Sequence, residues 1–564
     1  MVREEMGRIP GTIALFGCIP DHDHSSRCWQ LIVVKALAES PWGIFTGDGD
    51  HPIAMFMGIY MRYIRPGRIG EISIIGVLLL LGSIWLGGQI AADPVWAKAF
   101  TFTGIQITWM LIGYGFVASV LPVWLLLAPR DYLSTFLKIG TIVALAIGIL
   151  IVMPELKMPA LTQFAASGDG PVWKGGMFPF LFITIACGAV SGFHALIASG
   201  TTPKLLANER HMRYIGYGGM LMESFVAVMA LVAASIIDPG IYFAMNAPAA
   251  VIGPDAVSAA AYISNTWGFI ITPEQLEATA AAIGEPTILH RAGGAPTLAV
   301  GIAQILHEAI PSGSNAMMAF WYHFAILFEA LFILTAVDAG TRAGRFMLQD
   351  LLGSFVPALK RTESWTANLI ATAGCVAMWG YLLYQGVIDP LGGINTLWPL
   401  FGISNQMLAG IALMLATVVL IKMKRQRYIW VTMLPAVWLL ICTTTAGFIK
   451  LFDANPAIGF LSLAKKYSDA LANGQILAPA KSIDQMQHVI WNAYTNATLT
   501  ALFLFVVFSI LFYALKVGVV AWGNKERTDK RSPVPGCTGR VNEDCKACSM
   551  TSVASVNTSV RPPA

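Results

Sequence analysis

Residues 397–422 read LWPLFGISNQMLAGIALMLATVVLIK, a long apolar run interrupted at its centre by Ser404, Asn405 and Gln406. About 20 mostly apolar residues are enough for a helix to cross the ~30 Å of hydrocarbon in a bilayer. The run is long enough, so it predicts a membrane-spanning helix. Its three polar side chains would then lie deep in the bilayer, where polar groups need hydrogen-bond partners within the protein.

The composition extends this interpretation to the whole chain. Of 564 residues, 56% are hydrophobic and only 12% are charged, whereas soluble proteins have about 25% charged residues. The chain is therefore predicted to be an all-α polytopic membrane protein. Its net charge of +4 comes from basic residues scattered along the sequence, which argues against a nucleic-acid-binding face.

Similar apolar runs recur along the chain and predict about twelve transmembrane helices. The first run is interrupted and the second is short. Their centres are 11–39, 52–64, 70–92, 105–128, 134–153, 176–199, 214–237, 315–338, 366–387, 397–422, 428–451 and 495–521.

The connecting loops alternate in charge and so predict an orientation. Every second loop is rich in Lys and Arg, for example 422–427, and basic loops stay in the cytoplasm. Both termini are then expected in the cytoplasm, with 238–314 and 452–494 as long external loops that contain short helices. We expect residues 1–523 to form one multi-spanning domain and 524–564 to form a disordered cytoplasmic tail.

Two acidic residues fall within predicted membrane helices, Glu223 and Glu329. A charged group at membrane depth is costly and usually functional. Carboxyl groups there can take up and release protons, so both are candidates for proton coupling. The alternative is that such polar groups only hold helices together through hydrogen bonds. Asp338 and Arg342 are four residues apart and could form an ion pair at the end of a helix.

The segment around Ser191, Gly192 and His194 is rich in small residues. Glycine allows a helix to open or to approach another backbone closely, and transporters bind substrates where membrane helices are interrupted. We expect the substrate path to follow this segment and Ser404, Asn405 and Gln406. Tight packing of small residues would explain the same pattern without a substrate.

Known catalytic and nucleotide-binding signatures are absent from the sequence. HEAI at 307–310 lacks the second His of a zinc-protease motif, and without a Walker loop the chain is not predicted to be an ATP-driven pump. Cys537, Cys545 and Cys548 lack a fourth ligand at zinc spacing. The sequence therefore predicts neither an enzyme nor a bound metal or cofactor.

Several long strings resemble the carbon starvation protein A family, and they follow one another through nearly the whole chain. They include LIVVKALAESPWG at 31–43, FITIACGAVSGFHALIASGTTPK at 182–204, GYGGMLMESFVAVMALVAAS at 216–235, AVDAGTRAGRFMLQDLLG at 336–353 and the opening run at 397–422.

The resemblance implies a bacterial inner-membrane transporter that takes up peptides during carbon starvation, or pyruvate together with protons. It also implies an architecture similar to the amino acid–polyamine–organocation superfamily, with inverted repeats and broken helices. Family members are usually longer at the N-terminus, so we expect an N-terminal part to be missing here. The alternative is an inactive, truncated or frameshifted member, or a starvation-related signalling protein in the membrane.

Two polar stretches depart from the family, IPDHDHSSRCWQ at 19–30 and GDGDH at 47–51. A metal site in a loop is one interpretation of the first, because His22, His24 and Cys28 are possible ligands. A helix would not place His22 and His24 on one face, and Pro20 would disturb it. The favoured interpretation is a compensated frameshift, because both stretches, read one base later, permit apolar residues. A real polar loop remains the other alternative, with charges buried without partners.

Overall fold

The computed structural model describes residues 1–524, except 123, 173, 186–187, 189, 201, 203–205, 311–314, 354–355, 357–358, 360–363 and 392–393. The described residues form helices and no strands. The expected tail after Asn524, with Cys537, Cys545 and Cys548, lies outside the described residues. So do Lys204, Lys360 and Arg361, which were expected in the basic cytoplasmic loops 204–213 and 342–361.

Eight described helices are long and apolar enough to cross a membrane. They are α4 (Ile69–Ala92), α7 (Leu127–Val152), α13 (His211–Ser235), α19 (Asn315–Gly353), α20 (Trp365–Val387), α21 (Ile394–Lys422), α22 (Ile429–Phe452) and α24 (Ile483–Gly523). Each coincides with one of the predicted runs. The described part of the protein is therefore all-helical and has the long apolar helices of a multi-pass membrane protein.

The other four predicted runs are also helical but do not meet the same standard of length and hydropathy. α2 (Arg8–Leu37) and α3 (Pro41–Ile59) contain the two polar stretches, and α3 continues into a π-helical turn (Tyr60–Ile64). α6 (Gly104–Val120) is shorter. The run at 176–199 is divided into α9 (Met177–Thr184) and α11 (Gly192–Gly200).

Short helices connect the long ones. Within 238–314 they are α14 (Pro239–Asn246), α15 (Ala249–Ile252), α16 (Ala256–Trp267), α17 (Pro273–Ile283) and α18 (Ala295–Ala309), and within 452–494 there is α23 (Phe460–Ala472). The remaining short elements are α1 (Val2–Glu5), α5 (Pro94–Ala99), α8 (Phe164–Ser167) and a 3₁₀ turn (Gln426–Tyr428). The short helices expected in both long connections are therefore present.

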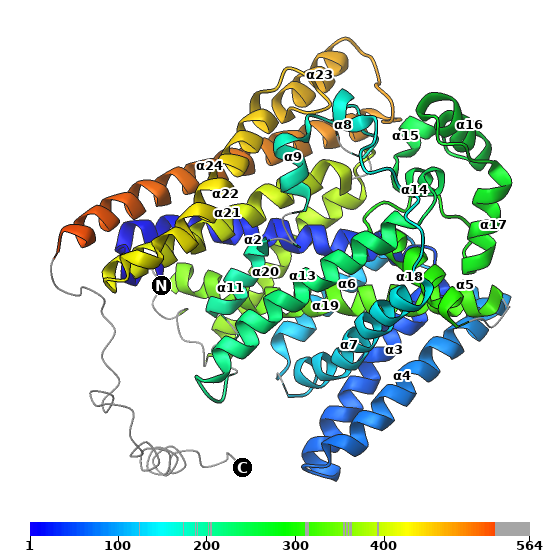
Figure 1. Cartoon of the computed structure of the whole chain (residues 1–564), viewed down its shortest axis with the longest axis horizontal. Coiled ribbons are helices and arrows are strands. Elements are labelled where there is room, and N and C mark those ends of the chain that lie inside the picture. Colours follow the sequence, from blue (N-terminus) through cyan, green and yellow to red (C-terminus); the bar gives the residue numbers. More distant parts are fainter. Residues whose placement is uncertain are drawn as a thin grey trace.

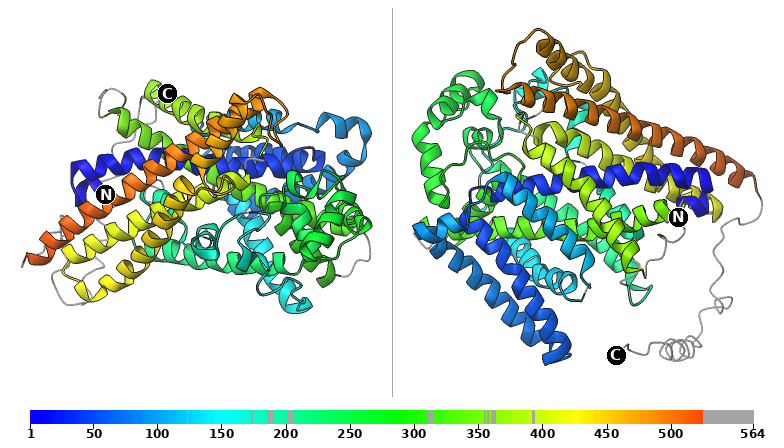
Figure 2. Two further views of the ribbon diagram at one scale, coloured as in Figure 1. Left: turned by 90° about the horizontal axis from the view of Figure 1, so that it is seen from above. Right: turned by 180° about the vertical axis from the view of Figure 1, so that it is seen from behind.

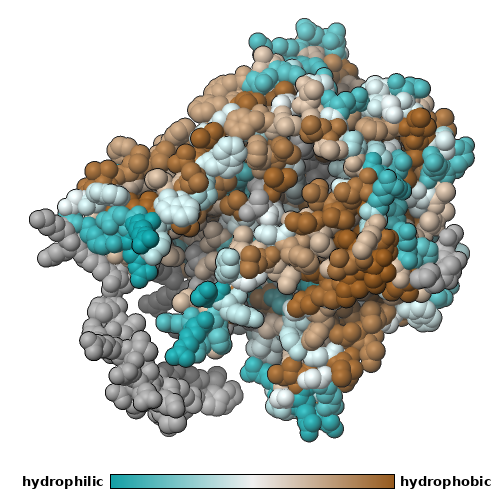
Figure 3. All heavy atoms as spheres, viewed as in Figure 1, coloured by the Kyte–Doolittle hydropathy of each residue, from teal (hydrophilic) through white to brown (hydrophobic). Residues whose placement is uncertain are grey.

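The face of the molecule seen in Figure 3 has large apolar areas, with hydrophilic residues gathered toward its edges. Long helices expose large side chains such as Leu78 of α4, Leu150 of α7 and Phe505 of α24, each at least 60% accessible. Patches of this size would destabilise a protein surrounded by water. They suit a surface that faces lipid tails.

α2 runs through the middle of the molecule (Figures 1 and 2) and packs against α19, α20, α21 and α24. It is one continuous helix through Pro20, with Asp21, His22, Asp23 and His24 buried. Both loop interpretations of residues 19–30, a polar loop and a metal site in a loop, are therefore wrong for the structure. Four packed neighbours hold the helix together where Pro20 removes a backbone donor.

The buried polar side chains of α2 divide into two sets. His22, His24 and Arg27 have partners, whereas Asp21, Ser25 and Gln30 have none among the described residues. The expectation of burial without partners therefore holds for only part of the stretch. His22 Nε2 lies 2.6 Å from the Gly340 carbonyl oxygen, while Arg27 lies 2.7 Å from His24 Nδ1 and 3.3 Å from the amide oxygen of Asn496. His22 and His24 thus face different neighbours, as expected for positions two apart on a helix. The Asp21 carboxylate lies beside Ser404, outside regular hydrogen-bond geometry.

A buried ionic cluster joins α3, α6, α7 and α19. Arg130 of α7 contacts Asp50 of α3 and Asp338 of α19, each at 2.8 Å, and the Tyr114 hydroxyl donates to Asp338 at 2.6 Å. Residues 130–138, between two predicted runs, were expected to form one of the basic cytoplasmic loops. Arg130 instead lies inside α7, and its side chain is only 1% exposed. The cluster ties together helices that are far apart in sequence.

The ion pair expected between Asp338 and Arg342 is not among the contacts of the described residues. Arg342 instead donates to the carbonyl oxygens of Ala118 and Leu121, at 2.7 and 2.8 Å. These carbonyls lie at the C-terminal end of α6, where a helix lacks internal partners and attracts cations. Asp338 pairs with Arg130 of α7 instead. Contacts between helices therefore decide the partners of both residues, and the spacing of four residues along α19 does not.

Replacing Arg130 with Met should lower the free energy of unfolding by roughly 3–5 kcal/mol, because two buried carboxylates lose their partner. Denaturant unfolding in mild detergent measures this change. The matched control is Arg65→Met, since Arg65 pairs with Glu71 at 3.0 Å on the exposed surface and should contribute little. An Arg130 effect no larger than the control would contradict the cluster's structural role.

Candidate functional site

The run at 176–199, predicted as one membrane segment, does not form one continuous helix; its glycines and small residues were compatible either with an opened helix or with tight packing. α9 ends at Thr184, and α11 begins at Gly192. The end of one helix leaves carbonyl groups without partners and the start of the next leaves N–H groups without partners. Both sets must be satisfied within the protein, because the bilayer interior offers no water.

Two adjacent side chains of α21 contact the two sides of this break. The Gln406 amide donates to the carbonyl oxygen of Phe182 in α9 at 2.8 Å. The Asn405 amide oxygen accepts from the backbone N–H of Phe193 in α11 at 3.0 Å. The polar residues expected within the membrane therefore hold the broken segment, with Gln406 also accepting from Thr443 of α22 at 3.4 Å.

Close backbone approach accompanies these hydrogen bonds. A methyl group at Gly192 would lie 1.8 Å from the Asn405 carbonyl oxygen, and one at Gly402 would lie 2.3 Å from the Ile183 carbonyl oxygen. Real atoms cannot approach so closely without backbone movement. The absence of a side chain at both positions lets α9 and α11 touch the backbone of α21.

His194, a residue of the predicted substrate path, contacts both Ser191 of the same path and Glu223, a predicted proton-coupling residue. Its Nδ1 lies 3.1 Å from the Glu223 carboxylate of α13 and also contacts the Ser191 hydroxyl. The Glu223 side chain is about one-fifth exposed and that of His194 is half exposed. A candidate coupling residue therefore sits directly against the candidate substrate path.

Glu329 does not join this group in the described structure. It lies in α19, and no ion pair or hydrogen bond to its carboxylate is found among the described residues. Its neighbours Phe328 and Leu331 belong to an apolar cluster with Met57 of α3 and Leu133 of α7. Ser404, by contrast, donates to the Phe401 carbonyl at 2.9 Å within α21 and lies beside Asp21.

Two cavities lie at opposite ends of the broken segment. One of about 610 Å³ is lined by Leu181 and Thr184 of α9 and by Trp398 of α21, together with Tyr242 and Asn246 of α14. Its walls are mainly apolar, with a few polar groups.

The other cavity, of about 930 Å³, is lined by Ala195 of α11, by Leu408 and Ala412 of α21, and by Phe346 of α19. Along α21, Asn405 and Gln406 lie between the residues that line the first cavity and those that line the second. The contact between α21 and the break therefore separates two spaces large enough for small solutes.

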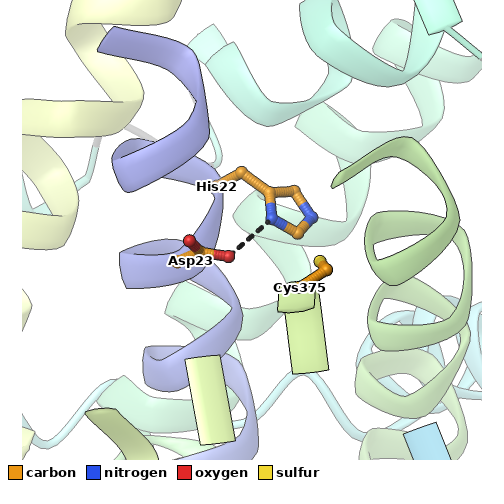
Figure 4. Close-up of side chains that lie close together, drawn as sticks. All are labelled: His22, Asp23 and Cys375. Atoms are coloured by element: carbon orange, nitrogen blue, oxygen red, sulfur yellow. Dashed lines mark hydrogen bonds and ion pairs between the residues drawn. The ribbon is translucent and has the colours of Figure 1, made fainter. Parts of the chain in front are cut away.

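A buried cluster of His22, Asp23 and Cys375 was missed as a group, because Cys375 comes from α20 (Figure 4). The three possible ligand atoms lie within 4.8 Å of one another. His22 contacts the Gly340 carbonyl through Nε2 and Asp23 through Nδ1 at 3.4 Å. A carbonyl oxygen only accepts hydrogen bonds, so His22 Nε2 carries its hydrogen in this contact and is not available there as a metal ligand.

Replacing Gly192 with Ala should destabilise the protein by roughly 1–3 kcal/mol or more, because the added methyl meets the backbone of α21. Gly140→Ala is the matched control, since Gly140 lies in α7 with no neighbour within 4 Å of the added carbon. Thermal unfolding of both variants in the same detergent gives the comparison. Equal unfolding temperatures would mean that α11 does not pack against Asn405 as described.

The chain is similar in sequence to proteins of one known family. The sequence model of the family described as "Carbon starvation protein CstA" matches residues 1–446. The "Pyruvate/proton symporter BtsT" of Escherichia coli (strain K12) is 62% identical over 555 residues, covering 94% of this chain and 77% of that protein. The "Peptide transporter CstA" of the same strain is 60% identical, covering 96% of this chain and 78% of the relative.

A third relative, the "Peptide transporter CstA" of Campylobacter jejuni, is 59% identical over 451 residues, covering 80% of this chain and 64% of that protein. No solved structure matches the chain. These relatives are named as transporters, which agrees with the predicted membrane transport function and with the prediction that the chain is not an enzyme. The chain belongs to the carbon starvation protein CstA family and is a membrane transporter.

Proposed function

We propose that this protein is a secondary active transporter of the bacterial inner membrane that imports peptides or a small carboxylate such as pyruvate together with protons. The observation that carries the proposal is the broken segment α9–α11, held by Asn405 and Gln406 between two cavities. Interrupted helices of this kind are where secondary transporters bind their substrates. A role in the carbon-starvation response follows from the family alone.

The two substrate classes share a carboxylate, which pyruvate and the C-terminus of a peptide both carry. The relatives named for the two classes are almost equally similar to this chain, at 62% and 60% identity. The N-terminal end of α11 faces the break, and a helix N-terminus favours negative charge. A carboxylate at this end, near Ser191 and His194, is the binding mode that we propose for either substrate.

The proposed orientation places both termini in the cytoplasm. The basic stretch Lys422–Arg427 follows α21 close to Leu420, which lines the larger cavity, and basic loops stay inside. The smaller cavity, next to the 238–314 connection, is then external. We further propose twelve crossings, made by the eight long apolar helices together with α2, α3, α6 and the α9–α11 pair, in an architecture similar to the amino acid–polyamine–organocation superfamily.

Uptake by purified protein in liposomes tests this proposal. Labelled pyruvate and labelled dipeptides are offered separately, with an inward proton gradient or with the gradient collapsed by a protonophore. One of the substrates should accumulate only with the gradient. If neither enters while the pyruvate/proton symporter relative works in the same liposomes, the alternative of an inactive or signalling member replaces the proposal. The buried charged residues of α2 favour that alternative.

Glu223 and Glu329 are the proposed proton-coupling residues. Glu223→Gln and Glu329→Gln should each lower gradient-driven accumulation by about tenfold or more, an energetic loss of about 1.4 kcal/mol or more, while exchange of substrate across the membrane continues. Glu277→Gln is the matched control, since Glu277 is an exposed residue of α17. Wild-type accumulation by both test variants would refute the assignment.

A further inference from the structure

A second buried polar group lies where the connection between α17 and α18 meets α3 and α19. Glu285 and Arg291 of this connection form an ion pair of 2.8 Å, and both are less than one-tenth exposed. The Ser40 hydroxyl, just before α3, donates to the other carboxylate oxygen of Glu285 at 3.1 Å. Breaking a buried pair of this kind by removing one charge is strongly destabilising, so the contact holds the connection against the membrane helices.

His323 of α19 completes the group. Its Nε2 lies 4.0 Å from the Glu285 carboxylate, and its ring stacks on Trp42 of α3 with centroids 4.0 Å apart. The side chain is 2% exposed, and within the described structure neither ring nitrogen has a hydrogen-bond partner. Buried polar groups are nearly always hydrogen-bonded. An imidazole left without partners beside a carboxylate is therefore an unusual arrangement.

Burial and the neighbouring groups shift the pKa of Glu285 in opposite directions. Burial raises the pKa of Glu285, while the positive charge of Arg291 and the Ser40 hydroxyl lower it, and the net direction is upward. Tyr322, the residue before His323, lies beside Arg291. The titratable or charged groups that face Glu285 are thus Arg291 from its own segment and His323 and Tyr322 from α19.

We propose that Glu285 and His323 form a proton-binding site that controls attachment of the α17–α18 connection to α3 and α19. This inference rests on the proposed proton-coupled transport. A proton that binds the Glu285 carboxylate cancels its charge and weakens the contact with Arg291, which frees the connection. The O–H of the protonated carboxyl donates to His323 Nε2, which otherwise has no partner among the described residues. When the proton returns to water the O–H bond breaks, and the restored carboxylate pairs again with Arg291.

Substrate-driven proton influx tests the site in liposomes that contain a pH-sensitive dye. Glu285→Gln should keep substrate exchange but lose both the proton influx and the pH dependence of uptake. Glu277→Gln, the exposed control on α17, should behave as wild type. If wild-type protein couples protons and Glu285→Gln couples them equally, this inference is wrong while the proposed function stands. If wild-type protein transports substrate without protons, the proposed coupling itself fails.

Because Glu285→Gln leaves Arg291 buried without its partner, it can also fail to fold. The double variant Glu285→Gln/Arg291→Gln removes both charges, and coupling retained in this variant would overturn the proposal.

Wild-type protein supplies an independent measurement. Hydrogen–deuterium exchange of peptide 284–294, corrected for the intrinsic effect of pH, should rise as the pH falls. Protection that does not change with pH would also overturn the proposal, whatever the variants do.

Discussion

The constraint on which this structure depends is that backbone groups inside a membrane cannot rely on water. A broken helix exposes such groups at both new ends, and each one left unpaired costs several kcal/mol. Here α21 supplies the partners: Gln406 donates to a carbonyl of α9, and Asn405 accepts from an N–H of α11. Two adjacent amides thus permit an interruption that the bilayer would otherwise forbid.

The same constraint explains the buried charges. Arg130 meets carboxylates from α3 and α19, and Arg342 and Arg345 meet the last carbonyl groups of α6. In every case the partner comes from a different helix. The charged groups therefore fix which helices lie side by side, a specificity that apolar contacts with lipid-like surroundings supply only weakly.

A transporter must also let part of this arrangement change. The contacts of Asn405 and Gln406 are single hydrogen bonds between neutral groups, each of modest net strength. The cavities on either side are separated by these contacts and by the closely packed glycines Gly192 and Gly402.

Much of the fold was predictable because long apolar runs in the sequence directly indicate membrane-spanning helices. All eight long apolar helices coincide with predicted runs, whereas the small residues at 186–200 left open whether this segment opens or only packs tightly. The Asp338–Arg342 pair was wrong because spacing along one helix ignores competing partners, which lie more than 200 residues away. The continuous course of α2 was missed for the same reason, since the helices that support Pro20 are distant in sequence.

Within the candidate site, sequence identified the right residue types but not their pairing. Glu223 and His194 were predicted for different roles and turn out to be in contact at 3.1 Å. The group around Glu285 was missed because Glu285 lies in a connection that reads as a surface loop, and its partners Ser40 and His323 lie on two other segments. The periodicity and composition of one segment do not indicate which side chains of distant segments it contacts.

The measurement that tests the central claim most directly is the accessibility of the two cavities during transport. Single cysteines at Leu181 and Ala412, which line the smaller and the larger cavity, are introduced into a background free of native cysteines. Their labelling by a hydrophilic maleimide is followed with and without substrate and a proton gradient. The account predicts opposite changes, with one position protected as the other becomes reactive. Constant labelling, or changes in the same direction, would contradict a substrate path through the break between α9 and α11.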